Sequence, residues 1–179
     1  MDSGRKILAL GGARSGKSQF ARRTAEASGL RPVLIATATA QDAEMAARIA
    51  RHRQERGPDW LTLEEPLDLG GAITLAAAPE RVVVVDCLTL WLTNVMLEGG
   101  NVEAEIAALL LAIRESAGPV ILVSNEVGQG IVPETPLGRA FRDAQGQLNQ
   151  AVAAACSDVV LLAAGLPLRL KPGAAMDLF

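Results

Sequence analysis

The chain has 179 residues, of which 50% are hydrophobic and 21% charged, a composition typical of a soluble globular protein with one substantial core. A formal net charge of −3 and an aromatic content of 3% argue against binding to nucleic acid, which requires a basic surface or base-stacking side chains. The sequence also lacks a membrane-spanning stretch, a signal-peptide core and a disulfide framework, so we expect a cytoplasmic protein with buried free thiols at Cys87 and Cys156.

The first predicted elements enclose a phosphate-binding loop. Residues 7–10 predict a strand and residues 17–27 a helix. The pattern G-x-x-x-x-G-K-[ST] lies between them as Gly11, Gly12, Ala13, Arg14, Ser15, Gly16, Lys17 and Ser18. We expect Lys17 to contact the β- and γ-phosphates of a nucleoside triphosphate, and the Ser18 hydroxyl to bind Mg²⁺. The alternative is a glycine-rich turn with a stray lysine, which leaves the flanking strand and helix unexplained.

The next strand, 33–36, leads into a short polar stretch and an arginine-rich helix. Residues 37–40 follow the strand at its carboxyl end, where open α/β sheets bind ligands. Asp42 is the predicted N-cap of a helix over 43–56. This helix carries the only histidine, His52, on its apolar stripe among four arginines. A neutral imidazole can attack phosphorus; the alternative is a partly buried structural histidine.

A second candidate for metal binding follows in the middle of the chain. Residues 60–64 predict a short extended segment and residues 66–78 a weak helix. The run 81–86, Arg-Val-Val-Val-Val-Asp, predicts a strand covered on both faces. Asp86 ends it as a Walker B carboxylate does, where it can hold Mg²⁺. The alternative is that Asp86 caps the helix predicted over 88–97.

The remaining predicted elements continue the alternation of strands and helices. They are a helix at 102–117, a strand at 120–124, a helix at 136–155, a strand at 159–163 and a loop-like tail at 165–179. The polar loop that begins at Asn125 and Glu126 is a candidate substrate contact. Arg139 and Arg142 could clamp phosphate or form surface salt bridges. The alternation predicts an α/β fold with a mainly parallel sheet and helices on both faces, in a single nucleotide-binding domain over 1–179.

Several segments together match one known family. They are 11–18, 35–38, 42–49 with His52-Arg53, 84–94, 124–128 with 130–133, 137–143, 148–150 and 164–168. On these segments the chain resembles the bifunctional adenosylcobinamide kinase / adenosylcobinamide-phosphate guanylyltransferase family of cobalamin biosynthesis. The resemblance spans nearly the whole chain.

The resemblance implies a fold, a reaction and a set of site residues. The implied fold is a RecA-like P-loop NTPase with an antiparallel hairpin, assembled as a homotrimer. The implied enzyme phosphorylates the aminopropanol hydroxyl of adenosylcobinamide with ATP or GTP, then transfers GMP from GTP to adenosylcobinamide phosphate through a GMP–histidine intermediate at His52. Lys17 and Asp86 are its other implied catalytic residues, with Mg²⁺ bound by Ser18 and Asp86. Nucleotide contacts are implied for Gly11–Ser18 and for Ala36, Thr37, Ala38, Arg53, Gln54, Glu55, Arg56, Glu64 and Asp86. Arg51 departs from relatives that have a second histidine there.

Two other functions remain open from the residues alone. One is a monofunctional P-loop small-molecule kinase in which His52 is structural. The other is a nucleotide-switched binding protein, although its usual guanine-reading N-K-x-D element is absent, because Asn125 is followed by Glu126-Val127-Gly128. A RecA-like nucleic-acid motor is disfavoured by the charge and the scarcity of aromatic residues.

Overall fold

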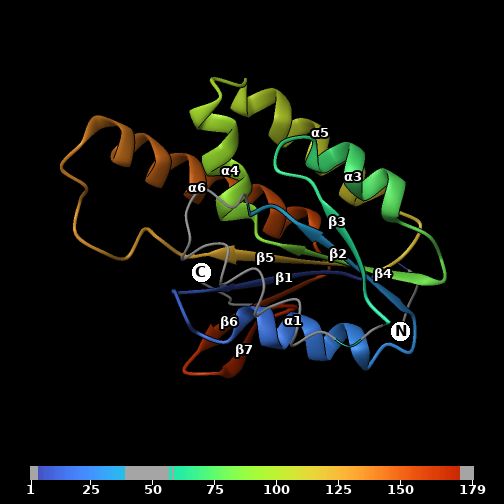
Figure 1. Ribbon diagram of the computed structural model, residues 1–179. Helices are drawn as coiled ribbons and strands as arrows, with labels where there is room; N and C mark the ends of the chain where they lie inside the picture. Colours follow the sequence, from blue (N-terminus) through green and yellow to red (C-terminus); the bar gives the residue numbers. More distant parts are fainter. Residues whose placement is uncertain (1–3, 39–56, 58, 174–179) are drawn as a thin grey trace, which may run out of the picture.

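A seven-stranded sheet forms the centre of the computed structural model, which describes residues 4–38, 57 and 59–173. The chain passes through the elements in Figure 1. They are β1 (Lys6–Gly11), α1 (Lys17–Glu26), β2 (Arg31–Ala36), β3 (Leu61–Glu64), α3 (Leu69–Ala76), β4 (Arg81–Asp86), α4 (Leu88–Leu97), α5 (Val102–Glu115), β5 (Val120–Asn125), α6 (Pro136–Ala155), β6 (Asp158–Ala163) and β7 (Leu166–Lys171).

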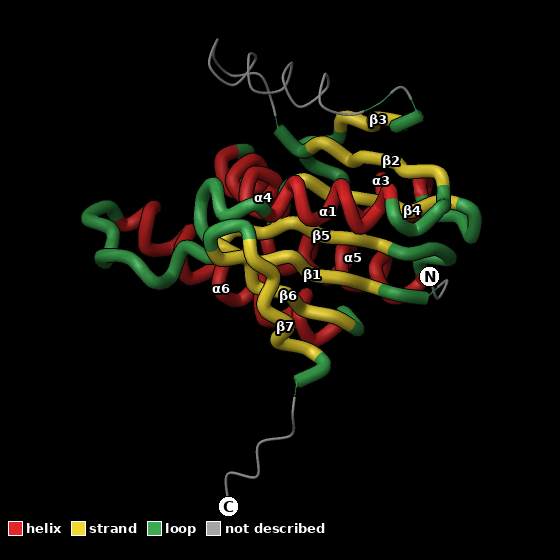
Figure 2. The backbone as a smooth tube through the Cα atoms, turned by 90° about the horizontal axis from the view of Figure 1, so that it is seen from below, coloured by secondary structure: helices red, strands yellow, loops and turns green. Residues whose placement is uncertain are grey.

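The strand order is β3-β2-β4-β5-β1-β6-β7, and only β7 pairs antiparallel with its neighbour. Figure 2 shows this order across the sheet. The central strands are runs of buried Val, Ile and Leu, as expected where helices cover both faces. Because β5 lies between β1 and β4, the strand that ends in Asp86 is separated by one strand from the strand that precedes the phosphate loop.

Helices cover both faces of the sheet, as the alternation of elements predicts. Helix α1 packs below the sheet in Figure 1, whereas α3, α4, α5 and α6 lie above it. The larger apolar cluster forms under these four helices around the fully buried Trp91. The smaller cluster joins Ala21 and Ala25 of α1 to the other face. Both cysteines are free and buried, as predicted, and burial raises the pKa of Cys87 to about 11 and that of Cys156 to about 12.

Two sequence predictions need correction. The sequence predicts a loop-like tail from residue 165, but Leu166–Lys171 forms β7, which pairs with β6 in a hairpin. Its turn, Ala164-Gly165, has positive φ at both residues. Such turns usually have Asn, Asp or Gly at the first position, so the alanine there gave no sign of a hairpin in the sequence. The helix predicted over 66–78 is shorter, because it starts only after the Asp68 N-cap. The extended segment near 60–64 is confirmed as β3, and the helix predicted over 43–56 lies outside the described residues.

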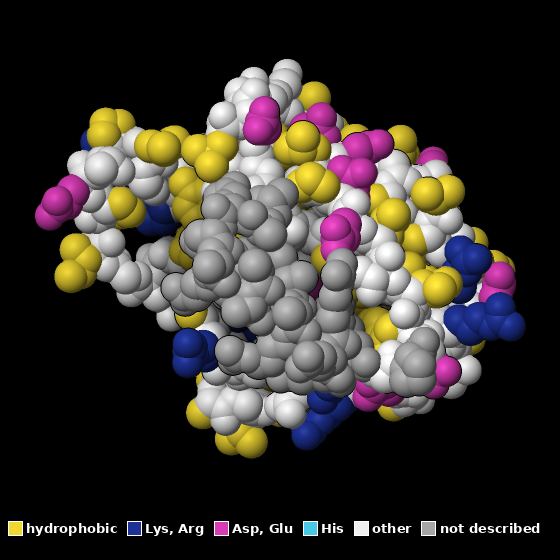
Figure 3. All heavy atoms as spheres, in the orientation of Figure 1, with side chains coloured by type: hydrophobic (Ala, Val, Ile, Leu, Met, Phe, Trp, Pro, Cys, Tyr) yellow, Lys and Arg dark blue, Asp and Glu magenta, His cyan; other side chains and the backbone are white. Residues whose placement is uncertain are grey.

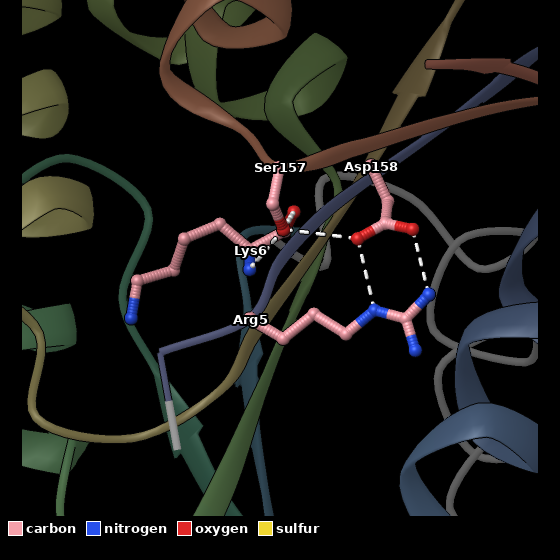
Figure 4. Close-up of polar contacts among 4 residues, drawn as sticks. All are labelled: Arg5, Lys6, Ser157 and Asp158. Carbon is pink, nitrogen blue, oxygen red and sulfur yellow. Dashed lines mark hydrogen bonds and ion pairs between the residues drawn. The ribbon is translucent and has the colours of Figure 1, made fainter. Parts of the chain in front are cut away.

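A polar cluster fastens the amino-terminal edge of the sheet, opposite the phosphate loop. Figure 4 shows the Arg5 guanidinium donating to both carboxylate oxygens of Asp158, at 2.9 and 2.6 Å. The Ser157 hydroxyl accepts from the Lys6 N–H and lies within bonding distance of the Lys6 carbonyl and the Asp158 carboxylate. The contacts between the starts of β1 and β6 join residues that are 151 to 153 positions apart in sequence, so they stabilise the fold rather than a site.

We expect Asp158→Asn to lower the free energy of unfolding by about 1–2 kcal/mol at neutral pH. The hydrogen bonds from Arg5 lower the pKa of Asp158, so this stabilisation is complete above the unfolded-state pKa, and falling pH removes it as the folded carboxylate becomes protonated. Urea unfolding at neutral pH and at about pH 3.5 measures the difference, which should shrink at the lower pH. Asp143→Asn is the matched control, because Asp143 pairs with Arg142 on the surface. A difference that grows as the pH falls would contradict this account.

Candidate active site

The strand register aligns the predicted site residues along one edge of the sheet. Gly11 at the end of β1 is level with Asn125 at the end of β5. Ala36 at the end of β2 is level with both Asp86 of β4 and Glu64 of β3. Asp86 is level with Val123 of β5, so β1 and β5 extend two residues beyond the ends of β4, β2 and β3. The phosphate loop lies at one side of this carboxyl edge and Glu64 at the other. Four spacings of about 4.8 Å separate Gly11 from Glu64 by roughly 19 Å along this edge.

The phosphate loop has the backbone shape that its sequence predicts. Arg14 and Gly16 have φ values of 57° and 100°, so the chain turns through left-handed conformations before α1. Gly16 is the N-cap of α1, and no described side chain bonds the amides of the first turn. These N–H groups and the positive end of the helix dipole form an anion site.

The loop is held from two sides by neighbouring strands. The Glu126 N–H donates to the Gly11 carbonyl at 3.1 Å, and the Gly165 N–H of the β6–β7 turn donates to the Ser15 carbonyl at 3.0 Å. Gly11 itself has no room for a side chain, since a Cβ atom would lie 2.5 Å from the Leu162 carbonyl oxygen. The hairpin that the tail forms is thus part of the loop's support.

Lys17 and Ser18 lie in the first turn of α1. The Lys17 side chain is buried, and its Nζ donates to the Gly12 carbonyl at 2.6 Å. The ammonium group therefore points back over the loop, where phosphate oxygens would be placed. Ser18 is half-buried beside it.

Asp86 lies at the carboxyl end of β4 and is half-buried. The alternative that it caps the next helix is wrong, because the N-cap of α4 is Cys87. Among the described residues, neither the Asp86 carboxylate nor the Ser18 hydroxyl has a hydrogen-bond partner. A carboxylate and a hydroxyl at one edge are the hard oxygen ligands that Mg²⁺ takes alongside phosphate oxygens and water, so these residues fit the ion.

The strand that ends in Ala36 continues into Thr37 and Ala38, whose environments differ. Ala36 and Ala38 are half-buried, whereas Thr37 is completely buried, with its hydroxyl bonded to the backbone of Cys87. Glu64 is exposed at the end of β3. The predicted residues His52, Arg53, Gln54, Glu55 and Arg56 lie outside the described part of the chain.

Sequence reasoning missed a buried polar network next to the phosphate loop. The Ser124 hydroxyl donates to the Asn149 Oδ1 atom at 2.6 Å, and the Gln145 amide contacts both residues at 3.0 Å. Asn149 also donates to the Asn125 carbonyl at 3.0 Å. Helix α6 therefore holds the carboxyl end of β5. The available signal was the spacing of Gln145 and Asn149, four residues apart on the buried face of an amphipathic helix.

The two arginines of α6 behave differently from each other. Arg142 forms an ion pair with Asp143, as the surface alternative predicts. Arg139 instead donates to the carbonyls of Pro133 and Glu134, so it fixes the loop that leads into the helix. Neither contact involves the phosphate loop.

A phosphate loop between β1 and α1, with a carboxylate two strands away, defines a P-loop nucleotide-binding protein of RecA-like architecture. The fold is similar to that of the RadB recombinase, with a TM-score of 0.50 and 19% identity over 89% of this chain and 74% of that one. It is also similar to the flagellar accessory protein FlaH from Methanocaldococcus jannaschii, with a TM-score of 0.54 and 13% identity over 97% and 83%.

Within this class, the chain belongs to the family cobinamide kinase / cobinamide phosphate guanyltransferase, which it matches over residues 7–170. It is 50% identical to the bifunctional adenosylcobalamin biosynthesis protein CobP of Pseudomonas aeruginosa, over 92% of this chain and 96% of that protein. It is 39% identical to the corresponding CobU of Escherichia coli, over 92% and 99%. The chain is therefore an enzyme of a bifunctional kinase and guanylyltransferase family, as the resemblance implies. No helix in the described part of the chain has the length and hydrophobicity needed to cross a membrane.

Proposed function

We propose that this protein phosphorylates adenosylcobinamide and then guanylylates the product, with both nucleotides bound along the carboxyl edge of the sheet. The observation that supports this most strongly is the register, which places Asp86, Ala36 and Glu64 at one level of the carboxyl edge, two residues short of the level of Gly11, where the phosphate loop begins. An extended nucleoside triphosphate can lie along this edge, with its phosphates at the loop and its nucleoside toward Glu64. The whole chain would act as one nucleotide-binding domain.

In the first reaction, the aminopropanol hydroxyl oxygen attacks the γ-phosphorus of ATP or GTP. The bond from that phosphorus to the β–γ bridging oxygen breaks, the nucleoside diphosphate leaves, and the hydroxyl proton is released. Lys17 and the N–H groups of the loop bind the phosphate oxygens and stabilise the charge that develops on them. Ser18 and Asp86 would hold Mg²⁺, which neutralises phosphate charge when bound.

In the second reaction, a ring nitrogen of His52 attacks the α-phosphorus of GTP. The bond to the α–β bridging oxygen breaks, and pyrophosphate leaves. A phosphate oxygen of adenosylcobinamide phosphate then attacks the same phosphorus, which breaks the P–N bond and restores the imidazole. The product is adenosyl-GDP-cobinamide. The covalent intermediate divides one displacement into two easier steps. Arg53, Gln54, Glu55 and Arg56 follow the nucleophile in sequence, and we assign them to nucleotide contacts on the family resemblance.

The experiment that tests this function uses wild-type protein with GTP labelled at either the α- or the γ-phosphate. The α-label should form an acid-labile, alkali-stable adduct on the protein, and adenosylcobinamide phosphate should discharge it as adenosyl-GDP-cobinamide. The γ-label should appear in adenosylcobinamide phosphate. A folded, GTP-binding protein that phosphorylates cobinamide but forms no adduct would instead be a monofunctional kinase.

We also propose that the protein is a cytoplasmic homotrimer. Leu166, Leu168 and Leu170 alternate along the edge strand β7 and are 46–72% exposed, so they offer an apolar strip for association. Figure 3 shows further exposed hydrophobic side chains over the loop that leads into α6. The buried free thiols agree with a reducing compartment. A monomeric mass by light scattering would contradict the trimer.

A further inference from the structure

Thr37, directly after β2, is joined to the end of the neighbouring strand by three hydrogen bonds. Its hydroxyl accepts from the Cys87 N–H at 2.8 Å and donates to the Cys87 carbonyl at 2.7 Å. Its own N–H donates to the Asp86 carbonyl at 3.3 Å. A single buried threonine thus bonds Asp86, the last residue of β4, and Cys87, the residue that follows it.

Asn94 of α4 holds Thr37 from the other side. The Asn94 Nδ2 group donates to the Thr37 carbonyl at 2.9 Å and to the Pro66 carbonyl at 3.2 Å. Trp91, one turn earlier, donates from its indole nitrogen to the Leu67 carbonyl at 2.7 Å. The helix that begins directly after Asp86 and Cys87 therefore ties together the segments that follow β2 and β3.

These contacts give every polar atom of Thr37 a partner within the protein. Its N–H, its carbonyl and its hydroxyl all bond protein groups, and its side chain is fully buried. The Asp86 carboxylate, in contrast, has no hydrogen-bond partner among the described residues. The backbone of residues 86 and 87, which Thr37 holds, fixes the direction of the Asp86 Cα–Cβ bond and so the region that the carboxylate can reach.

We infer that Thr37 is a positioning residue that aims the Asp86 carboxylate at the metal–nucleotide site, with Asn94 as its support. This inference rests on the proposed role of Asp86 in holding Mg²⁺. It assigns the Thr37 side chain a structural role, whereas the family resemblance implies a nucleotide contact for this residue. Residues that orient a metal ligand typically change metal affinity by 10- to 100-fold when they are removed.

The test compares Thr37→Val, which removes the hydroxyl at nearly constant shape, with Thr37→Ser, which keeps it. Calorimetry measures the affinity for a non-hydrolysable GTP analogue with Mg²⁺ and with EDTA. In Thr37→Val, the gain in affinity that Mg²⁺ produces should fall by about tenfold, while the affinity in EDTA stays within about twofold of wild type. Thr37→Ser should restore the gain. Thr74→Val is the matched control, because the Thr74 hydroxyl bonds no described residue except Gly70 of its own helix, whose carbonyl accepts.

Asp86→Asn separates this inference from the function on which it rests. If Asp86→Asn retains the full Mg²⁺ gain, the proposed metal role of Asp86 fails. The positioning role is overturned if Asp86→Asn loses the Mg²⁺ gain while Thr37→Val keeps it. It is also overturned if Thr37→Val loses GTP affinity equally in Mg²⁺ and in EDTA. If Thr37→Val does not fold by circular dichroism, Asn94→Ser is measured in its place. In Asn94→Ser the gain in GTP affinity that Mg²⁺ produces should also fall by about tenfold. An unchanged Mg²⁺ gain in that variant overturns the inference.

Discussion

Replacing His52 with alanine is expected to abolish the guanylyl adduct and the formation of adenosyl-GDP-cobinamide, while phosphorylation of adenosylcobinamide stays within about threefold of wild type. The reason is chemical, because only the second reaction needs a nitrogen nucleophile. The chain has a single histidine, so the adduct cannot move to another imidazole. The measurement is protein-bound label from GTP labelled at the α-phosphate, together with γ-label transfer to adenosylcobinamide.

Two controls make this result decisive. His52→Asn keeps a polar side chain of similar size without a nucleophilic nitrogen, so it should behave as the alanine variant does. Thermal unfolding of both variants shows whether the protein is intact. An alkali-stable adduct that persists in His52→Ala would place the nucleophile elsewhere. Equal loss of both activities in a folded variant would show that His52 acts in nucleotide binding and not as the nucleophile of one step.

Replacing Lys17 with methionine is expected to lower kcat/KM of both reactions by about 10²–10³-fold. Its Nζ lies over the phosphate loop, bonded to the Gly12 carbonyl at 2.6 Å, so the positive charge is in place before the nucleotide arrives. Methionine fills nearly the same volume without the charge. Both reactions should suffer because both develop negative charge on phosphate oxygens. Steady-state kinetics of each half-reaction, with calorimetric GTP binding, measures the effect.

Lys171→Met is the matched control for Lys17→Met. The Lys171 Nζ donates to the carbonyls of Ala153 and Ala154 at the end of α6, so its loss should affect stability slightly and catalysis little. Near-normal GTP affinity and turnover in Lys17→Met would mean that the loop amides alone bind the phosphates. Loss of both activities in Lys17→Met and of only the guanylyl transfer in His52→Ala would show that Lys17 serves both reactions and His52 serves one.

The sheet could be predicted from the sequence because its strands are continuous apolar runs. Val82–Val85 and 120–124 are buried on both faces, and no turn residue interrupts them. Strand β7 could not be predicted in this way. Its apolar residues are exposed and alternate with Pro167 and Arg169, and pairing with β6 supplies the hydrogen bonds that define it. Its existence as a strand depends on the partner more than on its own composition.

The residues of the candidate site also differ in whether the sequence could predict their roles. A phosphate loop is a local structure, because eight consecutive residues determine its turn, its N–H groups and its lysine. It can therefore be predicted from the sequence alone. Asp86 was also predictable, as a carboxylate at the end of a buried strand. The environment of Thr37 was not predictable, because its hydroxyl bonds the backbone of Cys87, 50 positions later in the sequence. The same holds for Asn94 and Asn149, whose partners are strand ends far away in sequence.

By itself, then, the sequence determined the type of fold, the phosphate loop and the family to which the chain belongs, since each of these follows from local pattern and residue identity. The tertiary structure decided which polar side chains face the site and which hold the strand ends beneath it. The physical reason is that a buried hydroxyl or amide must be satisfied by whatever backbone groups the fold brings near it. Strand order and register select those groups, and no local pattern specifies them.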